Sequence, residues 1–306
     1  MKIFRSFEEA KNIINPVVTT GSFDGVHIGH KSILNRLRML AEKYNGESVL
    51  ITFNPHPRKV LYPETAGKDL KFINSQEEKL DLLEKTGLDN VIIIEFTKEF
   101  SMITSEQFVR DLIHGILHAK VVVAGFNHHF GFNKEGNYRQ LWEWQEKYQF
   151  EAEEIPEQEV YHETVSSTRI RQAISEGYIQ RANAYLDHYY IITGKPEKYF
   201  DTDSIKLPAL FRLPRTEESK ILPSYGIYAV SIGSGAFKSK GMAIINRMSD
   251  SSPEVLLYNF NKAGFNSESK ITISFHKKIH GAFNFPGNNA ISKINLAIEE
   301  ISELIY

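Results

Sequence analysis

The sequence has 306 residues, of which 42% are hydrophobic and 24% charged, with a formal net charge of −2. This length fits two domains better than one core, and the near-neutral charge does not favour a nucleic-acid or membrane surface as partner. The sequence contains no cysteine, which excludes disulfides, thiol catalysis and cysteine-ligated metal centres. Residues 1–10 lack the apolar core of a signal peptide, and no stretch approaches the ~18 apolar residues of a membrane span, so we expect a cytoplasmic protein.

Residues 1–186 alternate between strand and helix signals. Short apolar runs bounded by turn residues predict strands, and apolar residues that recur every three or four positions predict helices. This alternation indicates an α/β domain with a parallel sheet covered on both faces, where ligands bind beyond the carboxyl ends of the strands. The predicted strands are residues 16–20, 48–53, 91–96 and 120–125, and the predicted helices are residues 33–41, 76–86, 105–117, 138–148 and 167–176.

Residues 187–306 carry a different pattern and are expected to form a second, smaller domain. Apolar runs follow one another at short spacing, without helices between them, which predicts an antiparallel barrel or sandwich. A polar segment at residues 195–219 has no clear period and is expected to be a linker or a long loop. The predicted strands are residues 227–232, 242–245, 255–260 and 270–275, followed by a helix at residues 290–304.

The segment at residues 21–30, G-S-F-D-G-V-H-I-G-H, directly follows the first predicted strand and leads into a helix. A strand, a glycine-rich turn and a helix N-terminus form an anion site, because free backbone N–H groups and the helix dipole point at a bound phosphate. An imidazole can also donate a hydrogen bond to a phosphoryl oxygen as charge develops there. His27 and His30 are therefore catalytic candidates, although either histidine alone is more often a surface or capping residue.

Two further segments follow predicted strands. In residues 53–57, F-N-P-H-P, two prolines fix a rigid loop that presents Asn54 and His56, unless the loop is only a structural turn. Residues 125–131, G-F-N-H-H-F-G, carry aromatic and amide side chains suited to stacking a flat ring and hydrogen-bonding its edges. The adjacent histidines invite a metal site, but no acidic or histidine residue stands nearby at ligand spacing, so we do not expect one.

The fourth motif is the segment at residues 165–171, V-S-S-T-R-I-R, in which hydroxyls and two arginines begin a helix. Guanidinium groups are always charged and bind phosphoryl oxygens bidentately, so the segment predicts a phosphate clamp, with a helix cap beside surface arginines as the alternative. Two phosphate-binding elements indicate a nucleoside triphosphate, and the lack of a P-loop argues against ordinary γ-phosphate transfer. The candidates for binding this triphosphate are Gly21, Phe23, Asp24, Gly29, Ser167, Thr168, Arg169 and Arg171.

These motifs carry a family resemblance. Residues 21–30 resemble the G-x-F-D-x-x-H-x-G-H signature of the HIGH-type nucleotidyltransferases, and residues 167–171 resemble their second phosphate motif. Together with N-P-H-P, the Glu78-Lys79 helix, Phe96-Thr97 and G-x-N-x-x-F-G, they make residues 15–185 look like the bacterial bifunctional riboflavin kinase/FAD synthetase family.

The resemblance implies a Rossmann-like domain that joins ATP to FMN, giving FAD and pyrophosphate, with Mg²⁺ as the expected cofactor. It implies that His27 and His30 stabilise the triphosphate at the transition state. It also implies that Thr168, Arg169 and Arg171 hold the β- and γ-phosphates. The residues that it places on the flavin side are Asn54, His56, Asn127 and Phe130.

The second domain is similar to the riboflavin kinase barrel of this family but departs from it. Residues 223–230 and 253–260 match two of its strand motifs, and Glu254 matches its catalytic base. Its G-F-P-T-A-N motif, whose Thr and Asn hold Mg²⁺ and ATP, is missing, and Ala209 and Phe211 stand at those two positions. A methyl and a phenyl group offer no oxygen to a hard cation, so we expect a degenerate kinase domain unless a nearby oxygen ligand replaces them. The candidates for that ligand are Asp201, Thr202 and Asp203.

Three alternatives stay open: an enzyme that also phosphorylates riboflavin to FMN, a nucleotidyltransferase for another acceptor, and a non-catalytic flavin or nucleotide sensor. The histidines and the Thr168-Arg169 pair argue against the sensor, because binding alone does not need transition-state donors. The long stretch between the phosphate motifs and the attached barrel argue against another acceptor. The expected partners are small molecules, ATP and FMN, with no nucleic acid and no membrane; the pattern predicts no oligomeric state.

Overall fold

The structure is a computed structural model that describes residues 1–160, 163–199, 210–214, 217, 219–234, 237–246, 253–260, 269–283 and 289–304. By spatial contact the chain divides into two compact units. The first unit comprises residues 1–70 and 79–165, and the second comprises residues 71–78 and 166–306. The helix that begins at Ser167, assigned to the first domain from its sequence, therefore groups with the second unit, while a domain boundary at residue 186 stays a prediction.

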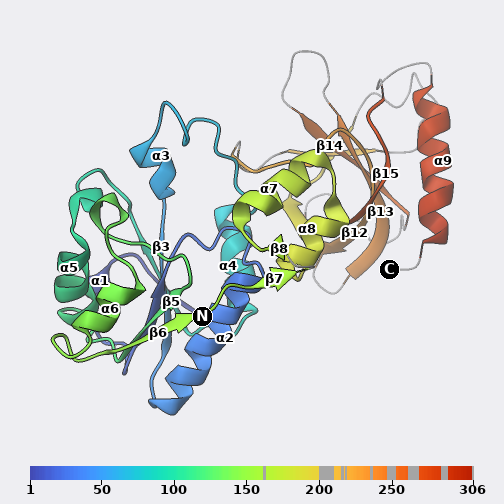
Figure 1. Cartoon of the computed structure of the whole chain (residues 1–306). Helices are drawn as coiled ribbons and strands as arrows, with labels where there is room; N and C mark the ends of the chain where they lie inside the picture. The colour runs from blue at the N-terminus through green and yellow to red at the C-terminus, as the bar shows by residue number, and fades with distance from the viewer. Residues whose placement is uncertain are drawn as a thin grey trace. The chain divides into compact units, whose positions relative to one another are not determined.

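The first unit is built on a six-stranded sheet with the order β1-β4-β3-β2-β5-β6 (Figure 1). Every neighbouring pair is parallel, and the central strand β2 pairs with β3 on one side and β5 on the other. Runs of valine and isoleucine suit these strands because helices cover both faces of the sheet. The strands are β1 Lys2–Phe4, β2 Val17–Thr20, β3 Ser48–Phe53, β4 Asn90–Ile94, β5 Val121–Gly125 and β6 Glu151–Ile155.

Each face of this sheet has its own apolar core. Leu34, Leu37 and Leu40 of helix α2 pack against one face together with Leu83 of helix α4. The other face is covered by the segments at residues 7–13, 108–117 and 141–150. The helices are α1 Phe7–Ala10, α2 Ile28–Lys43, α3 Pro57–Leu61, α4 Gln76–Glu84, η1 Phe100–Met102, α5 Ser105–Gln107, η2 Phe108–His114, η3 Phe132–Lys134 and α6 Tyr138–Trp144, and the strands β7 Glu159–Val160 and β8 Glu163–Thr164 form a hairpin.

The segment expected to be helical at residues 105–117 is helical over residues 105–114. Only α5 is an α-helix, and it continues as the π-helix η2, in which the Gly115 N–H donates to the Arg110 carbonyl at 2.9 Å. The wider turn changes which side chains share a face, and it directs Phe108, Val109 and Ile113 into the buried core. Apolar spacing of three and four does not distinguish a π-helix from an α-helix.

The second unit contains a curled seven-stranded sheet with the order β10-β11-β14-β13-β12-β15-β9, in which every neighbouring pair is antiparallel (Figure 1). The expected α/β domain with a parallel sheet and the expected antiparallel second domain are both confirmed. The strands are β9 Tyr190–Gly194, β10 Glu197–Lys198, β11 Phe211–Leu213, β12 Gly226–Ser234, β13 Phe237–Asn246, β14 Glu254–Asn259 and β15 Ile271–His280.

Among the described residues, the helices α7 Ser167–Glu176, α8 Ile179–Leu186 and α9 Ala290–Glu303 belong to this unit. Helix α9 has an apolar face of alanine and isoleucine that packs on β12, β13 and β14. The expected linker at residues 195–219 is wrong in part, because β10 and β11 lie within it and pair with each other. Residues 200–209 lie outside the described part of the chain.

The short segment at residues 71–78 is held in the second unit by main-chain bonds. The Phe72 N–H donates to the Ser219 carbonyl at 2.7 Å, and the Ile221 N–H donates to the Phe72 carbonyl at 2.8 Å. Glu78, which is buried, accepts hydrogen bonds from the Thr193 N–H and from the ammonium of Lys220. A stretch that lies between two elements of the first unit in sequence is thus part of the second unit's core.

Candidate functional site

Three of the four sequence motifs follow adjacent strands of the parallel sheet. Residues 21–27 follow β2, residues 54–56 follow β3 and residues 126–131 follow β5. Because β2 lies between β3 and β5, these three loops emerge at the same edge of the sheet. The fourth motif does not: it follows the β7–β8 hairpin and begins α7, which groups with the second unit.

The turn after β2 is compact. Gly25 has a φ of +92°, which a residue without a side chain adopts at little cost, and Phe23 and Val26 have φ values of +49° and +40°. The Gly21 N–H donates to the Ile51 carbonyl at 3.0 Å and ties the turn to β3. The path of the turn buries Asp24 and delivers His27 to the N-terminus of α2.

The two histidines form a stack at the start of α2. His27 is the N-cap residue, and its Nδ1 accepts a hydrogen bond from the His30 N–H at 3.4 Å. The ring centroids of His27 and His30 lie 3.7 Å apart, and their planes differ by 16°. The ring of Phe23 stacks on His30, with 4.4 Å between the centroids. The capping role expected as the alternative for His27 is thus present, and it also orients the imidazole.

His30 is held in its neutral form. Burial lowers the pKa of His30 well below 6.5, and the nearby charges of His27 and Lys79 lower it further. Its Nδ1 atom is buried and has no hydrogen-bond partner among the described residues. A neutral imidazole has one N–H donor and one acceptor nitrogen, so one ring nitrogen of His30 can donate a hydrogen bond to a ligand oxygen.

Lys79 of α4 is a residue that the motif analysis did not assign to the site. Its side chain is buried, and its ammonium donates to the Ser22 carbonyl at 3.3 Å and to the Thr52 hydroxyl at 3.4 Å. The lysine therefore contacts the glycine-rich turn and the end of β3 at once, and places a positive charge beside the histidines. Nothing in the apolar spacing of α4 distinguishes Lys79 from a surface lysine.

The loops after β3 and β5 present their amide side chains outward. Asn54 is exposed, and its N–H donates to the Ile94 carbonyl at 3.0 Å. His56 caps α3, and its Nδ1 accepts from the Arg58 N–H at 3.1 Å. Asn127 is exposed as well, whereas Phe130 is partly buried. Asn54 and Asn127 thus stand near the edge of the sheet with exposed side chains, whereas His56 is partly buried.

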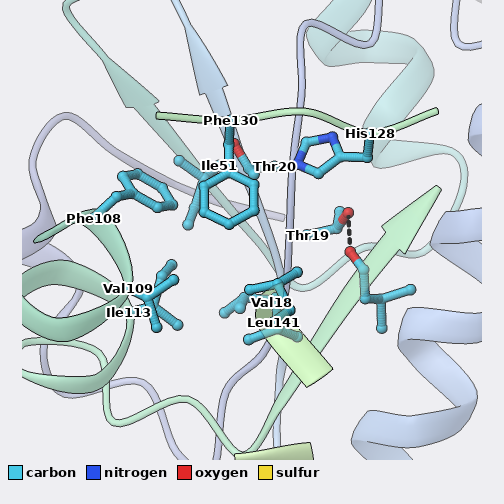
Figure 2. A pocket seen from close by; sticks show the side chains of 12 residues that line it. Val18, Thr19, Thr20, Ile51, Phe108, Val109, Ile113, His128, Phe130 and Leu141 are labelled. Atoms are coloured by element: carbon cyan, nitrogen blue, oxygen red, sulfur yellow. Dashed lines mark hydrogen bonds between the residues drawn. The ribbon is translucent and has the colours of Figure 1, made fainter. Parts of the chain in front are cut away.

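A pocket lies beneath the loop after β5, between the sheet and the π-helix (Figure 2). Its walls are mainly apolar, and three of its side chains carry polar atoms: Thr19, Thr20 and His128. The apolar lining is Val18, Ile51, Phe108, Val109, Ile113, Val122, Val123, Phe130 and Leu141. The free space between these side chains is about 10 Å³, which is room for about one water molecule.

At the start of α7, Ser166 caps the helix by accepting from the Arg169 N–H at 3.4 Å. Thr168 and Arg169 are exposed, while Ser167 and Arg171 are partly buried. The Arg171 guanidinium donates to the Thr168 hydroxyl at 3.4 Å, so hydroxyl and guanidinium groups gather on the first turn. The helix cap that was the alternative to a phosphate clamp is thus present, and Thr168 and Arg169 of the predicted clamp are exposed to solvent.

In the antiparallel unit, Glu254 lies on β14 beside Arg212 of β11. The Arg212 guanidinium binds Glu254 at 3.5 Å and Glu197 of β10 at 2.9 Å. Phe211 lies on β11 and is partly buried. Of the other residues considered for the missing metal motif, Ala209 and the alternatives Asp201, Thr202 and Asp203 lie outside the described part of the chain.

Among the described residues, no group of three histidine, cysteine, aspartate or glutamate side chains is arranged to hold a metal ion. Likewise, within the described part of the chain, no helix has the length and apolar character needed to cross a membrane.

Comparisons with known proteins point to one family. The sequence model of the FAD synthetase family matches residues 9–169. The bifunctional riboflavin kinase/FMN adenylyltransferase of Listeria monocytogenes is 30% identical over 88% of this chain and 81% of its own length. The protein of the same name from Bacillus subtilis is 28% identical over 96% of this chain and 91% of its own.

A solved structure shares the fold over the full length of both chains. It is described as a macrolide-efflux protein from Streptococcus pneumoniae, and it covers 100% of each chain with a TM-score of 0.86. At 24% identity, this similarity bears on the fold alone.

Proposed function

Because the chain belongs to the FAD synthetase family, we propose that it transfers the adenylyl group of ATP to FMN, giving FAD and pyrophosphate. The observation that carries the proposal is the pair of stacked histidines on the glycine-rich turn, at the edge of the sheet where the loops after β3 and β5 also emerge. The turn is suited to phosphate, and the aromatic and amide side chains of the two neighbouring loops are suited to a flat ring, which are the two chemistries that this reaction has to bring together.

The reaction is an in-line substitution at phosphorus. A phosphate oxygen of FMN attacks the α-phosphorus of ATP, a new P–O bond forms, and the bond to the bridging oxygen breaks to release pyrophosphate. The negative charge that develops on the phosphoryl oxygens is stabilised by hydrogen bonds from His27 and His30 and by the charge of Lys79. His30 acts as a hydrogen-bond donor, and no covalent nucleophile is needed.

The remaining candidates bind the two substrates. The turn residues Gly21, Phe23, Asp24 and Gly29 shape the triphosphate site, because their backbone runs into the N-terminus of α2. The first turn of α7 binds phosphate through its hydroxyl and guanidinium groups. Those groups belong to Ser167, Thr168, Arg169 and Arg171. On the flavin side we assign Asn54, His56, Asn127 and Phe130.

Mg²⁺ fits this site as an ion that arrives with ATP. The ion is usually held by substrate phosphates, waters and one or two carboxylates, not by a protein cage. The described residues contain no such cage, and the turn contains the one carboxylate of Asp24. When bound, the ion neutralises phosphate charge; the residues that would hold it beside the triphosphate include Asp24.

The test is a product analysis with purified protein, ATP, Mg²⁺ and FMN, separated by chromatography. FAD and pyrophosphate should appear in equal amounts. Nicotinamide mononucleotide and phosphopantetheine serve as alternative acceptors, and neither should be converted. If the folded protein forms no FAD from FMN, or prefers another acceptor, the proposal is wrong.

We further propose that the second unit has lost most or all riboflavin kinase activity. The candidate base Glu254 forms an ion pair with Arg212, which also binds Glu197. Phe211 stands where the family has an oxygen or amide ligand for ATP and Mg²⁺.

Riboflavin offered in place of FMN, with ATP and Mg²⁺, should leave both FMN and FAD undetected over hours at an enzyme concentration that readily converts FMN to FAD. Formation of FMN plus FAD from riboflavin at a comparable rate would show that the chain is fully bifunctional and that another residue replaces the missing motif.

A further inference from the structure

Three side chains that the adenylyl transfer does not use form a polar cluster in the second unit: Ser224, Tyr228 and Lys278. Ser224 directly precedes β12, and Tyr228 of β12 and Lys278 of β15 are partners in the register of the two strands. The Lys278 ammonium donates to the Ser224 Oγ at 2.7 Å, and that oxygen lies 3.1 Å from the Tyr228 hydroxyl. A serine, a lysine and a tyrosine thus meet within hydrogen-bond distance.

The hydrogen bonds of this cluster run in one direction. The Tyr228 hydroxyl donates its proton to the Ser224 carbonyl at 2.6 Å, and burial keeps this proton in place by raising the pKa of Tyr228 to about 12. The Ser224 hydroxyl therefore donates to the Tyr228 oxygen and accepts from Lys278. When Lys278 loses a proton, its lone pair faces the Ser224 Oγ, and the hydroxyl can donate to the amine instead.

Lys278 is a partly buried lysine without an acidic partner. Within the described part of the chain, its ammonium binds Ser224 and lies 5.8 Å from the centroid of the Tyr228 ring, and it forms no ion pair. Burial lowers the pKa of Lys278. Such an amine becomes neutral at a lower pH than an exposed lysine does, and the neutral amine is the form that can remove a proton from a hydroxyl.

Two glycines make room for the cluster. Gly177 follows α7 with a φ of +83°, and a Cβ atom there would lie 2.4 Å from the Ser224 Oγ and 2.9 Å from the Lys278 Nζ. Gly226 begins β12 with a φ of +150°, and a Cβ atom there would lie 2.9 Å from the Lys278 Cε. Glycine adopts both of these φ values at little cost. The serine and the lysine can thus meet because both neighbouring positions lack a side chain.

The turn that carries Ser224 also offers a main-chain donor. The N–H of Tyr225, the next residue, makes no hydrogen bond to any residue that the structure describes. An N–H directly after a nucleophilic serine is a common donor to the oxyanion that forms during acyl transfer. Ser224 is partly exposed and Tyr225 is exposed, so the turn is open to solvent and to a small ester.

We propose that Ser224 is a nucleophile, with Lys278 as its base, that takes up acyl groups from small carboxylic esters. The Ser224 Oγ attacks the carbonyl carbon, and Lys278 accepts the hydroxyl proton and passes it to the leaving alcohol as the ester C–O bond breaks. Water then attacks the acyl-serine with the help of the same base, which releases a carboxylic acid and restores the hydroxyl. Lysine is a known base for serine nucleophiles on unrelated folds. This activity goes beyond the proposed adenylyl transfer and does not depend on it.

The experiment uses the whole protein and a fluorophosphonate, a reagent that labels serines activated as nucleophiles, and the labelled residue is identified by mass spectrometry of peptides. Lys278→Arg keeps a cation but cannot lose its proton, and Lys278→Gln is a second variant without a base. Ser231→Ala is the matched control, because Ser231 lies on β12 and its hydroxyl also contacts a basic side chain, that of His276, at 3.0 Å. Circular dichroism shows that each variant is folded.

We expect the label on Ser224, and hydrolysis of p-nitrophenyl acetate at a rate above that of Ser224→Ala. Both labelling and hydrolysis should fall by about 10²-fold or more in the Lys278 variants and stay unchanged in Ser231→Ala. No label on the parent, a label on Ser231 in place of Ser224, or equal rates in the parent and the folded Lys278 variants would each overturn the inference. Labelling of Ser224 without hydrolysis of the ester would overturn it as well. FAD formation is measured separately, so failure of one activity is distinguished from failure of the other.

Discussion

The buried ion pair of the second unit offers a sharp test of how that unit is held together. Lys220 is 3% exposed and Glu78 is 2% exposed, and their side chains form an ion pair. The Lys220 ammonium also donates to the carbonyls of Ile73 at 2.6 Å and Ile191 at 2.8 Å. The pair therefore fastens residues 71–78 to the antiparallel sheet.

Replacing Lys220 by Met keeps the length of the side chain but leaves the Glu78 carboxylate buried without its cation. Removing one partner of a buried pair typically costs about 3–5 kcal/mol, because the remaining charge is not solvated. With a urea dependence of about 2 kcal/mol/M, the unfolding midpoint seen by circular dichroism should fall by about 2 M. Hydrogen exchange should show lost protection at Phe72 and Ile221, whose N–H groups bond across this contact.

The double variant Glu78→Gln/Lys220→Met is the control. It has no buried charge, and the glutamine oxygen can still accept the Thr193 N–H that Glu78 accepts at 2.8 Å. Most of the lost stability should return, which a double-mutant cycle measures as a coupling energy. If Lys220→Met is as stable as the parent, or if the double variant is no better than the single one, the reasoning about this pair is wrong.

Three other predictions concern the site and its histidines. His30→Ala should lower kcat and kcat/KM for FAD formation together by about 10²–10³-fold, with little change in ATP affinity, because it removes a hydrogen-bond donor used mainly in the transition state. An effect on KM alone would contradict this role. Arg169→Ala should weaken ATP binding as well, because a guanidinium binds phosphate already in the ground state, and unchanged ATP affinity by calorimetry would remove it from the site. Burial lowers the pKa of His128 and of His276 to about 4, so the unfolded chain binds more protons between pH ~4 and ~6.5, and stability should rise with pH through that window. Urea titrations at several pH values should show this slope in the parent and a flatter one in His128→Gln or His276→Gln; equal slopes would contradict it.

The parallel sheet and the loops at its edge could be predicted because their signals are local. Strand β2 is a short apolar run that ends at a glycine, and the spacing of His27 and His30 places both at one helix start. A strand between two turn signals and a helix with a clear period depend little on the rest of the chain. The sequence therefore indicated that the segments at residues 21–27, 54–56 and 126–131 follow strands, which is where the structure has them.

Other features depend on contacts between distant residues and leave no local signal. Lys79 reaches the glycine-rich turn from α4, and Glu78 beside it pairs with Lys220, which is 142 residues away. Both looked like members of a polar helix, since periodicity does not show which charged side chain is buried. Strands β10 and β11 were missed for the same reason, because two or three residues gain strand structure only from their partners.

The central claim is that an adenylyl group moves, and the fate of the phosphates tests it most directly. Two reactions with FMN and Mg²⁺ differ only in whether ATP is labelled with ³²P at the α or the γ position. The account predicts that the α label appears in FAD and the γ label in pyrophosphate, with both lost in His30→Ala. Label from the γ position on the flavin, or α label that stays in ADP or free AMP while FMN is unchanged, would contradict it.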